Sequence, residues 1–307
     1  MKTKAKLVFI LLNILTFTNC VGGNRPLPEK RKFSSEEVDK FIENTSKQFI
    51  DRDLAKIYEN CFPNTLDTTV EHDPDKNDTF IITGDIEAMW LRDSSFQAFP
   101  YIKHAKGDLK LKQRMLDLIK RQTKSILIDP YANAFNKDEF DSPWQIDETY
   151  KLVDGKRVHA MNKKIWERKY ELDSPVSTLF FAYNFYKETH DNSFIFEKQW
   201  QDALEKILRL VKQEMRGTEE EDKNGGPEYF FQRSTTESFD SLHQGRGNPV
   251  NSCGLVKTMF RNSDDAVTYA YNIPENAFLV GTFNKVADML KKVALTSVQK
   301  CKFYIYY

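Results

Sequence analysis

The stretch WQDALEKILRLV, residues 200–211, carries apolar side chains at Trp200, Leu204, Ile207, Leu208 and Val211. Apolar residues spaced three or four positions apart form one face of an α-helix, so this stretch is predicted to be an amphipathic helix. Working outward from it, the same spacing predicts further helices over 111–126, over 176–186, and from Ile273 through Leu290. The chain is therefore predicted to be all-α.

The first helix is predicted by signals for its N-terminal end. Ser34 and Glu37 have the spacing of a capping box, and Phe33 and Val38 have the spacing of a hydrophobic staple. Apolar residues then recur at helical spacing as far as Ile57.

Three long segments, 62–93, 129–173 and 217–263, separate the predicted helices and are rich in Asp, Asn, Pro, Gly and aromatic residues. Long segments of this kind inside a compact domain are usually functional or disordered. Helix pairs joined by long segments suggest a helical toroid whose loops gather at one mouth.

The composition favours a neutral ligand. Lys and Arg number 45, as do Asp and Glu, so the formal net charge is zero. No basic stripe is present, which argues against a nucleic acid as partner. Aromatic residues make up 13% of the chain, a share that suits sugar binding.

The N-terminus has the pattern of a signal peptide over 1–23. Lys2, Lys4 and Lys6 precede an apolar run from Leu7 to Phe17 that is too short to span a bilayer. The protein is therefore predicted to be secreted, periplasmic or at the cell surface. Cys20 leaves open the alternative of a lipid anchor.

Metal and disulfide signals are weak. The four cysteines fit no zinc site, and Cys61 and Cys253 could form a disulfide or remain as buried free thiols. The segment from Asp73 to Asp78 begins like a calcium loop but lacks the glycine and the glutamate that such a loop needs. No metal or cofactor is predicted.

The first motif that could carry chemistry is residues 83–94, with Trp90, Arg92 and Asp93. A tryptophan can stack on a sugar face, and an arginine beside an aspartate can bind neighbouring hydroxyls. An Arg–Asp pair that caps a helix beginning at Ser94 would have the same spacing, so both interpretations stay open.

The second motif is residues 129–136, with Asn133 and Asn136. Asparagine amides both donate and accept hydrogen bonds, as sugar hydroxyls require. Asp-Pro and asparagine are also typical turn residues, which leaves a purely structural role open.

The third motif is residues 166–174, in which Arg168, Glu171 and Asp173 stand beside aromatic residues. Carboxylates two positions apart next to an arginine could form one wall of a site. A charged helix start, capped by Asp173 or Ser174, is the alternative.

The fourth motif is residues 260–266, with Arg261 followed by Ser263, Asp264 and Asp265. Adjacent carboxylates beside an arginine are candidates for acid catalysis. The alternative is again a helix start, with Ser263 as cap and acids in the first turn.

In this order, the four motifs resemble glycoside hydrolase family 125, the exo-acting α-1,6-mannosidases. The resemblance covers about 26–295 and extends to the runs 59–69, 142–144 and 231–233. It implies an (α/α)6 barrel and metal-independent hydrolysis with inversion. The implied partners are glycans with terminal α-1,6-linked mannose.

The resemblance also implies roles for individual residues. Asp264, the first aspartate of the Ser-Asp-Asp motif, would be the general acid. The residues that would line the terminal-sugar pocket are Trp90, Arg92, Asp93, Asn133, Asn136, Arg168, Glu171, Asp173, Arg261 and Asp265. Asn262 stands where the family has proline, and the insertion at 147–164 is longer than usual.

The family's general base is a glutamate near the C-terminus in a His-Glu-Gly-Phe type segment, which this sequence lacks. The barrel is therefore expected to be incomplete, with a partial glycosidase domain over 24–297 and an unrelated tail over 298–307. We expect the chain alone to be aggregation-prone and catalytically impaired.

Two other functions remain open. One is a non-catalytic fragment that binds mannose through Arg92 and Asp93. The other is a toroidal glycosidase with a different linkage specificity.

Overall fold

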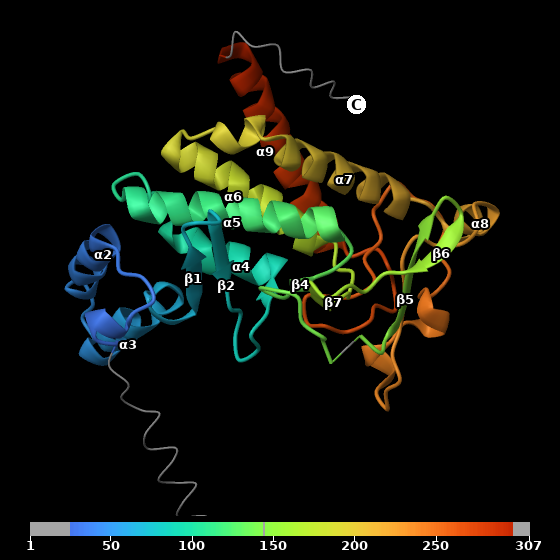
Figure 1. Ribbon diagram of the computed structural model, residues 1–307, viewed down its shortest axis with the longest axis horizontal. Coiled ribbons are helices and arrows are strands. Elements are labelled where there is room, and N and C mark those ends of the chain that lie inside the picture. The colour runs from blue at the N-terminus through green and yellow to red at the C-terminus, as the bar shows by residue number, and fades with distance from the viewer. Residues whose placement is uncertain (1–24, 144, 297–307) are drawn as a thin grey trace, which may run out of the picture. The chain divides into compact units, whose positions relative to one another are not determined.

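The computed structural model of the chain describes residues 25–143 and 145–296 (Figure 1). The predicted signal peptide, Cys20 and the predicted tail over 298–307 lie outside the described residues. The chain divides into two compact units, Met1–Val70 and Glu71–Tyr307. Among the helices described, none combines the length and the apolar character that a bilayer crossing needs.

Two helices and two helical turns form the first unit: η1 (Pro28–Lys30), α2 (Glu36–Ser46), α3 (Arg52–Cys61) and η2 (Thr65–Thr69). The prediction of Ser34 as cap is wrong by one residue, because Oγ of Ser35 accepts the hydrogen bond from N of Val38 at 3.4 Å. The helical pattern is also interrupted before Ile57. A new helix begins where Oδ1 of Asp51 accepts a hydrogen bond from N of Asp53 at 2.8 Å.

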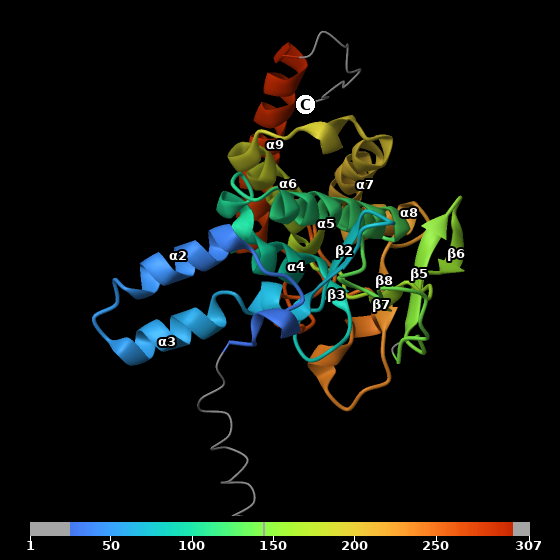
Figure 2. The ribbon, with the colours of Figure 1, turned by 60° about the vertical axis from the view of Figure 1, so that its left-hand side comes forward.

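The described part of the second unit contains both long helices and short helical turns: α4 (Leu91–Ala98), η3 (Phe99–His104), α5 (Leu109–Ile128), α6 (Asp173–Thr189), η4 (Ser193–Phe196), α7 (Lys198–Glu214), α8 (Thr218–Lys223), η5 (Ser238–Asp240), η6 (His243–Gly245) and α9 (Ile273–Thr296). Figures 1 and 2 show α5, α6 and α7 side by side, and α4 and α9 pack against α6. The four helices predicted from spacing in this unit are confirmed as α5, α6, α7 and α9.

Amphipathic spacing explains how α7 packs. Trp200, Leu204 and Ile207 are buried as expected, but Leu208 is 40% exposed and Leu210 is buried in its place. Leu210 belongs to an aromatic-rich core that also includes residues of the long segments. Helix α7 therefore packs against the long segments through apolar contacts.

Three small sheets lie in the long segments, where no strand was predicted. The first pairs β1 (Val70–Asp73) with β2 (Asp78–Ile81). The second contains β3 (Met89–Trp90), β4 (Ala134–Phe135) and β7 (Ile165–Glu167), and the third contains β6 (Lys156–His159), β5 (Glu148–Val153) and β8 (Phe230–Gln232). The pairs within the two three-stranded sheets are antiparallel. The calcium-like segment is the turn of the first hairpin, where Oδ1 of Asp73 accepts hydrogen bonds from N of Asp75 and N of Lys76.

Cys61 and Cys253 are both free and exposed. Neither of the two alternatives left open, a disulfide or a pair of buried thiols, is observed.

Candidate active site

The sheet β3–β4–β7 brings three of the four predicted motifs together. Strand β3 leads into the first turn of α4, which carries Arg92, and β4 lies between Asn133 and Asn136. Strand β7 leads into residues 168–173. Because β4 pairs with both of its neighbours, segments far apart in the sequence become adjacent.

Arg92 is the centre of a cluster of carboxylates. Its Nη1 lies 2.5 Å from Oε2 of Glu171 and 3.1 Å from Oδ1 of Asp173. Its Nη2 lies 3.6 Å from Oδ2 of Asp93 and donates a hydrogen bond to the main-chain carbonyl of Asn262 at 3.4 Å. The guanidinium of Arg92, in the first motif, therefore contacts residues of the third and fourth motifs.

Burial sets the protonation of this cluster. Burial raises the pKa of Glu171 to about 8, although Arg92 opposes the shift; the carboxylate of Asp173 adds to it. Burial likewise raises the pKa of Asp173, and it raises the pKa of Glu275 to about 7. Acids with pKa values raised this far hold protons near neutral pH, so the cluster is not fully ionised there.

The Ser-Asp-Asp motif forms a tight loop closed by an antiparallel bridge between Phe260 and Ala266. Asp264 has a φ of 69° and is exposed, and its carboxylate accepts no hydrogen bond within the described part of the chain. Asp265 is engaged, because its Oδ2 lies 2.6 Å from Nη2 of Arg261. No helix begins in this loop, so the helix-start alternative is wrong here and Asp264 is the carboxylate left available.

This loop is fixed to the third motif through main-chain bonds. The carbonyl of Tyr170 accepts hydrogen bonds from N of Met259 at 3.1 Å and from N of Phe260 at 2.9 Å. The buried Nζ of Lys169 donates to the main-chain carbonyl of Asp264 at 3.0 Å. The position of the Asp264 carboxylate therefore depends on residues almost a hundred positions earlier.

Arg168, predicted to line the sugar pocket, is fully buried. Its Nε donates to Oδ2 of Asp129 at 2.8 Å, and its guanidinium lies over the rings of Tyr131 and Tyr229. These contacts hold the guanidinium of Arg168 in the core, where it is closed to solvent.

The two predicted asparagines are also buried. Nδ2 of Asn133 donates to Oε2 of Glu167 at 3.2 Å, and its Oδ1 accepts from N of Lys169 at 3.1 Å. Nδ2 of Asn136 donates to the main-chain carbonyls of Lys163 and Ile165. Both amides tie β4 to the segment around β7, which agrees with the structural role left open for them.

The other predicted residues divide by exposure. Trp90, Arg92, Asp93 and Asp265 are partly exposed, and Arg261 is exposed. Glu171 and Asp173 are buried beneath Arg92. Within residues 25–143 and 145–296, no group of three or more His, Cys, Asp or Glu side chains is placed to hold a metal ion.

Sequence reasoning missed an ionic network centred on Arg233. Its guanidinium lies 2.8 Å from Asp147, 3.1 Å from Glu167 and 3.0 Å from Asp240, and Asp240 also lies 3.1 Å from Nζ of Lys169. Burial lowers the pKa of Arg233, but Asp147 and Glu167 together outweigh it and raise the pKa above its usual value. The run Phe-Gln-Arg at 231–233 was the available signal, but spacing alone could not show its partners.

A glycoside hydrolase needs an acid that can protonate a glycosidic oxygen. An exposed aspartate on a fixed loop, beside an arginine that binds buried carboxylates, is compatible with this chemistry. Residues 51–305 match the family described as metal-independent α-mannosidase (GH125). The chain belongs to this family of glycoside hydrolases.

Two known proteins are similar to the chain. The chain is 38% identical over 280 residues to the meiotically up-regulated gene 157 protein of Schizosaccharomyces pombe, a match that covers 87% of this chain and 53% of the yeast protein. The chain thus spans about half the length of that curated relative.

The second relative is a solved metal-independent α-mannosidase from Streptococcus pneumoniae, in a non-productive complex with α-1,6-mannobiose. The two chains are 36% identical with a TM-score of 0.75, and the match covers 87% of this chain and 59% of the bacterial one. This likeness confirms the predicted helical toroid class, and the small sheets are additions to it.

Proposed function

We propose that the protein removes terminal α-1,6-linked mannose from glycans by metal-independent hydrolysis with inversion. The observation that carries this proposal is the fixed loop that presents Asp264 beside the cluster of Arg92, Glu171 and Asp173. The complex of the bacterial relative with α-1,6-mannobiose supports the choice of linkage.

Four accessible residues and one buried carboxylate have roles in this proposal. Asp264 gives its proton to the glycosidic oxygen as the bond to mannose breaks. Arg92 and Asp93 bind neighbouring hydroxyls of the terminal mannose, and Trp90 packs against its apolar face. Glu171 holds Arg92 in place from below.

Inversion also needs a second carboxylate that activates water, roughly 6.5–9.5 Å from the acid. Glu171 and Asp173 are buried and bound to Arg92, so neither is free to take a proton from water. We infer that the base comes from outside the described residues and that this chain alone binds mannosides but hydrolyses them poorly.

The test is to incubate the chain with α-1,6-mannobiose and follow the anomeric protons by NMR. Binding with slow but measurable release is the expected result, and the mannose released should appear first as the β anomer. Rapid release would contradict the inference about the base, and α-mannose as first product would contradict inversion.

Asp264→Asn separates the role of the acid from binding. Any residual hydrolysis should fall by about 10² to 10⁴, while affinity for methyl α-mannoside stays unchanged. Equal hydrolysis in the variant would exclude Asp264 as the acid. If wild-type chain binds but never turns over, the mannose-binding alternative describes this chain better.

Secretion through a signal peptide over 1–23 is a further part of the proposal, supported by the lysines and the short apolar run. Sequencing the N-terminus of the exported protein tests it, with cleavage near residue 23 as the expected result.

A further inference from the structure

The hairpin of β5 and β6 carries two lysines on one of its faces (Figure 2). Residues directly opposite each other in an antiparallel pair share a face, and the register pairs Lys151 with Val158 and Val153 with Lys156. The two lysines are therefore diagonal neighbours. Such neighbours are roughly 7–8 Å apart, so long side chains at both positions can reach one ligand. We call the surface formed by these four residues the hairpin face.

A third ammonium group, that of Lys206 on α7, lies near the hairpin face. Burial lowers the pKa of Lys206; the carboxylate of Asp129 opposes this shift, and the positive charge of Lys151 adds to it. Nζ of Lys206 donates to the neutral main-chain carbonyl of Leu127 at 2.7 Å. The carboxylate of Asp129 is already engaged, because its Oδ2 accepts from Nε of Arg168. Two like charges thus lie near each other, which disfavours the charged form of Lys206.

These lysines have no counter-ion of their own. Within residues 25–143 and 145–296, no carboxylate lies within ion-pair distance of Lys151, Lys156 or Lys206. Lys163, a little further along the same long segment, shows the contrast, because its Nζ lies 2.9 Å from Oδ1 of Asp141. The lysines around the hairpin face are therefore available to an anion from outside the chain.

Protection of the sheet edge is the simplest alternative role for these lysines. Edge strands often carry lysine, because its charge opposes pairing with another chain. Strand β6 is an edge strand of its sheet, so this role accounts for Lys156. It does not account for Lys151, which lies on the central strand β5, or for Lys206, which lies on a helix.

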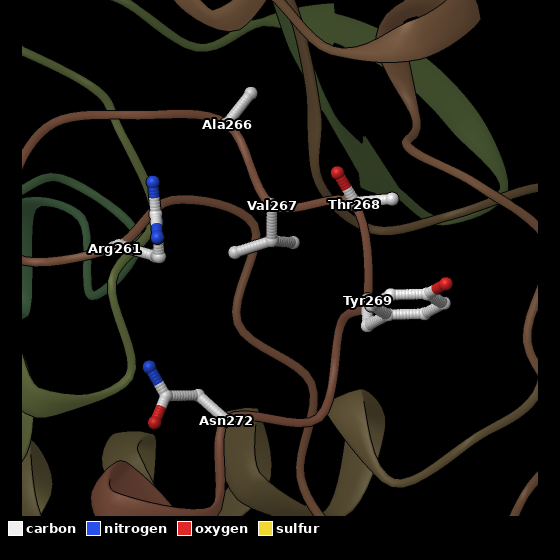
Figure 3. Close-up of a pocket in the computed structure, with 6 residues that line it drawn as sticks. All are labelled: Arg261, Ala266, Val267, Thr268, Tyr269 and Asn272. Atoms are coloured by element: carbon white, nitrogen blue, oxygen red, sulfur yellow. The ribbon is translucent and has the colours of Figure 1, made fainter.

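A second place where an anion could meet a cation is the hollow directly after the Ser-Asp-Asp loop. Arg261 lines this hollow together with Val267 and Asn272 (Figure 3). Its Nη2 lies 2.6 Å from Oδ2 of Asp265, so this guanidinium already has a counter-ion. The lysines around the hairpin face are therefore the better anion site.

A phosphate group is the anion that fits these cations. An ammonium group is a compact charge with three donors, and lysine is a common phosphate ligand. A phosphate group carries up to two negative charges and three acceptor oxygens, so several ammonium groups can bind it at once. Val153 and Val158 lie beside the lysines and are each 44% exposed, so they can contact the C–H face of a sugar.

We propose that the hairpin face, together with Lys206, binds a phosphate group carried by a sugar of the glycan. The choice of a glycan as carrier rests on the proposed function, whereas the site shares no residue with the Arg92 cluster. Glycans that carry a phosphorylated mannose then bind more tightly than neutral ones.

The experiment measures the binding of three probes to the full chain by titration calorimetry: methyl α-mannoside, mannose 6-phosphate and inorganic phosphate. Salt at about 0.15 M screens attraction between distant exposed charges. The wild type should bind mannose 6-phosphate at least about tenfold more tightly than methyl α-mannoside. The double variant Lys151→Gln, Lys156→Gln should lose about tenfold for mannose 6-phosphate and nothing for methyl α-mannoside. Lys163→Gln is the matched control, because that lysine already has a counter-ion, and it should bind all three probes like the wild type.

The outcomes distinguish this inference from the proposed function. Equal affinity of the wild type for mannose 6-phosphate and methyl α-mannoside, or no loss in the double variant, overturns the inference and leaves the proposed function standing. Equal affinity for inorganic phosphate and mannose 6-phosphate overturns the sugar as carrier. If methyl α-mannoside does not bind but the double variant still loses mannose 6-phosphate, the proposed function fails and the phosphate site stands. A loss confined to the phosphorylated probes supports the inference.

Discussion

Replacing Glu171 by glutamine should remove much of the pH dependence of stability. Burial raises the pKa of Glu171 from its usual 4.5 to about 8. Between these values the folded state holds a proton that the unfolded state has released. Stability must therefore fall as the pH rises through this window, because deprotonation favours the unfolded chain.

The size of the effect follows from the width of the window, about 3.5 pH units. One group contributes at most about 1.4 kcal/mol per unit, which gives a ceiling of about 4–5 kcal/mol at pH 8. Glutamine cannot ionise, and its Oε1 can still accept from Arg92 and Ser174, as Oε2 of Glu171 does. Glu275, with a pKa raised to about 7, keeps part of the slope in the variant.

Urea unfolding at half-unit steps from pH 4.5 to 8.5 measures the effect. Glu171→Gln should match the wild type at pH 4.5 and become progressively more stable, with a melting temperature up to roughly 10 °C higher at pH 8. The control is Glu205→Gln, which removes an exposed carboxylate paired with Arg209 on α7. Parallel pH profiles for wild type and Glu171→Gln would refute the argument that burial governs this carboxylate.

Three other substitutions test the frame and the site. Arg92→Leu should lower the free energy of unfolding by about 3–5 kcal/mol at pH 9, where Glu171 is ionised and the substitution leaves it and Asp173 without a cation; urea denaturation measures this, and a loss below 1 kcal/mol would contradict it. Lys169→Met should speed hydrogen exchange at the amide of Asp264, because it removes the hydrogen bond from Nζ of Lys169 to the main-chain carbonyl of Asp264. Unchanged exchange would show that the loop 260–266 keeps its conformation without this bond. Leu210→Ala should cost about 2–5 kcal/mol in thermal or urea unfolding, as expected for a buried leucine, whereas the same change at an exposed leucine of α7 should cost little.

The helices were predictable because each carries a long apolar pattern. Spacing from Trp200 onward found α7, and it failed only at Leu208, where the apolar face ends and the next leucine is the buried one. The sheet β3–β4–β7 was not predictable, since strands of two or three residues have no alternation to detect.

The site was predictable as a set of motifs but not as a geometry. The sequence selected Arg92 and Asp264 and left open whether each belonged to a helix cap. Which residues are buried depends on contacts between distant segments, such as those that bury Arg168 completely. The partners of Arg233 and Lys169 were invisible for the same reason, because their spacing in the chain carries no information on contacts.

The connection between β4 and β7 is a place where the chain can change in length. The chain leaves the sheet after β4 and returns to it at β7, and the two ends are joined where N of Asn136 donates to the carbonyl of Lys164 at 2.9 Å. Lengthening a loop whose two ends are already held together changes stability little, because the entropic cost of loop closure grows only with the logarithm of loop length. Residues 137–164 are thus a place where evolution or an engineer can insert sequence while the pairing of β4 with β7 is kept.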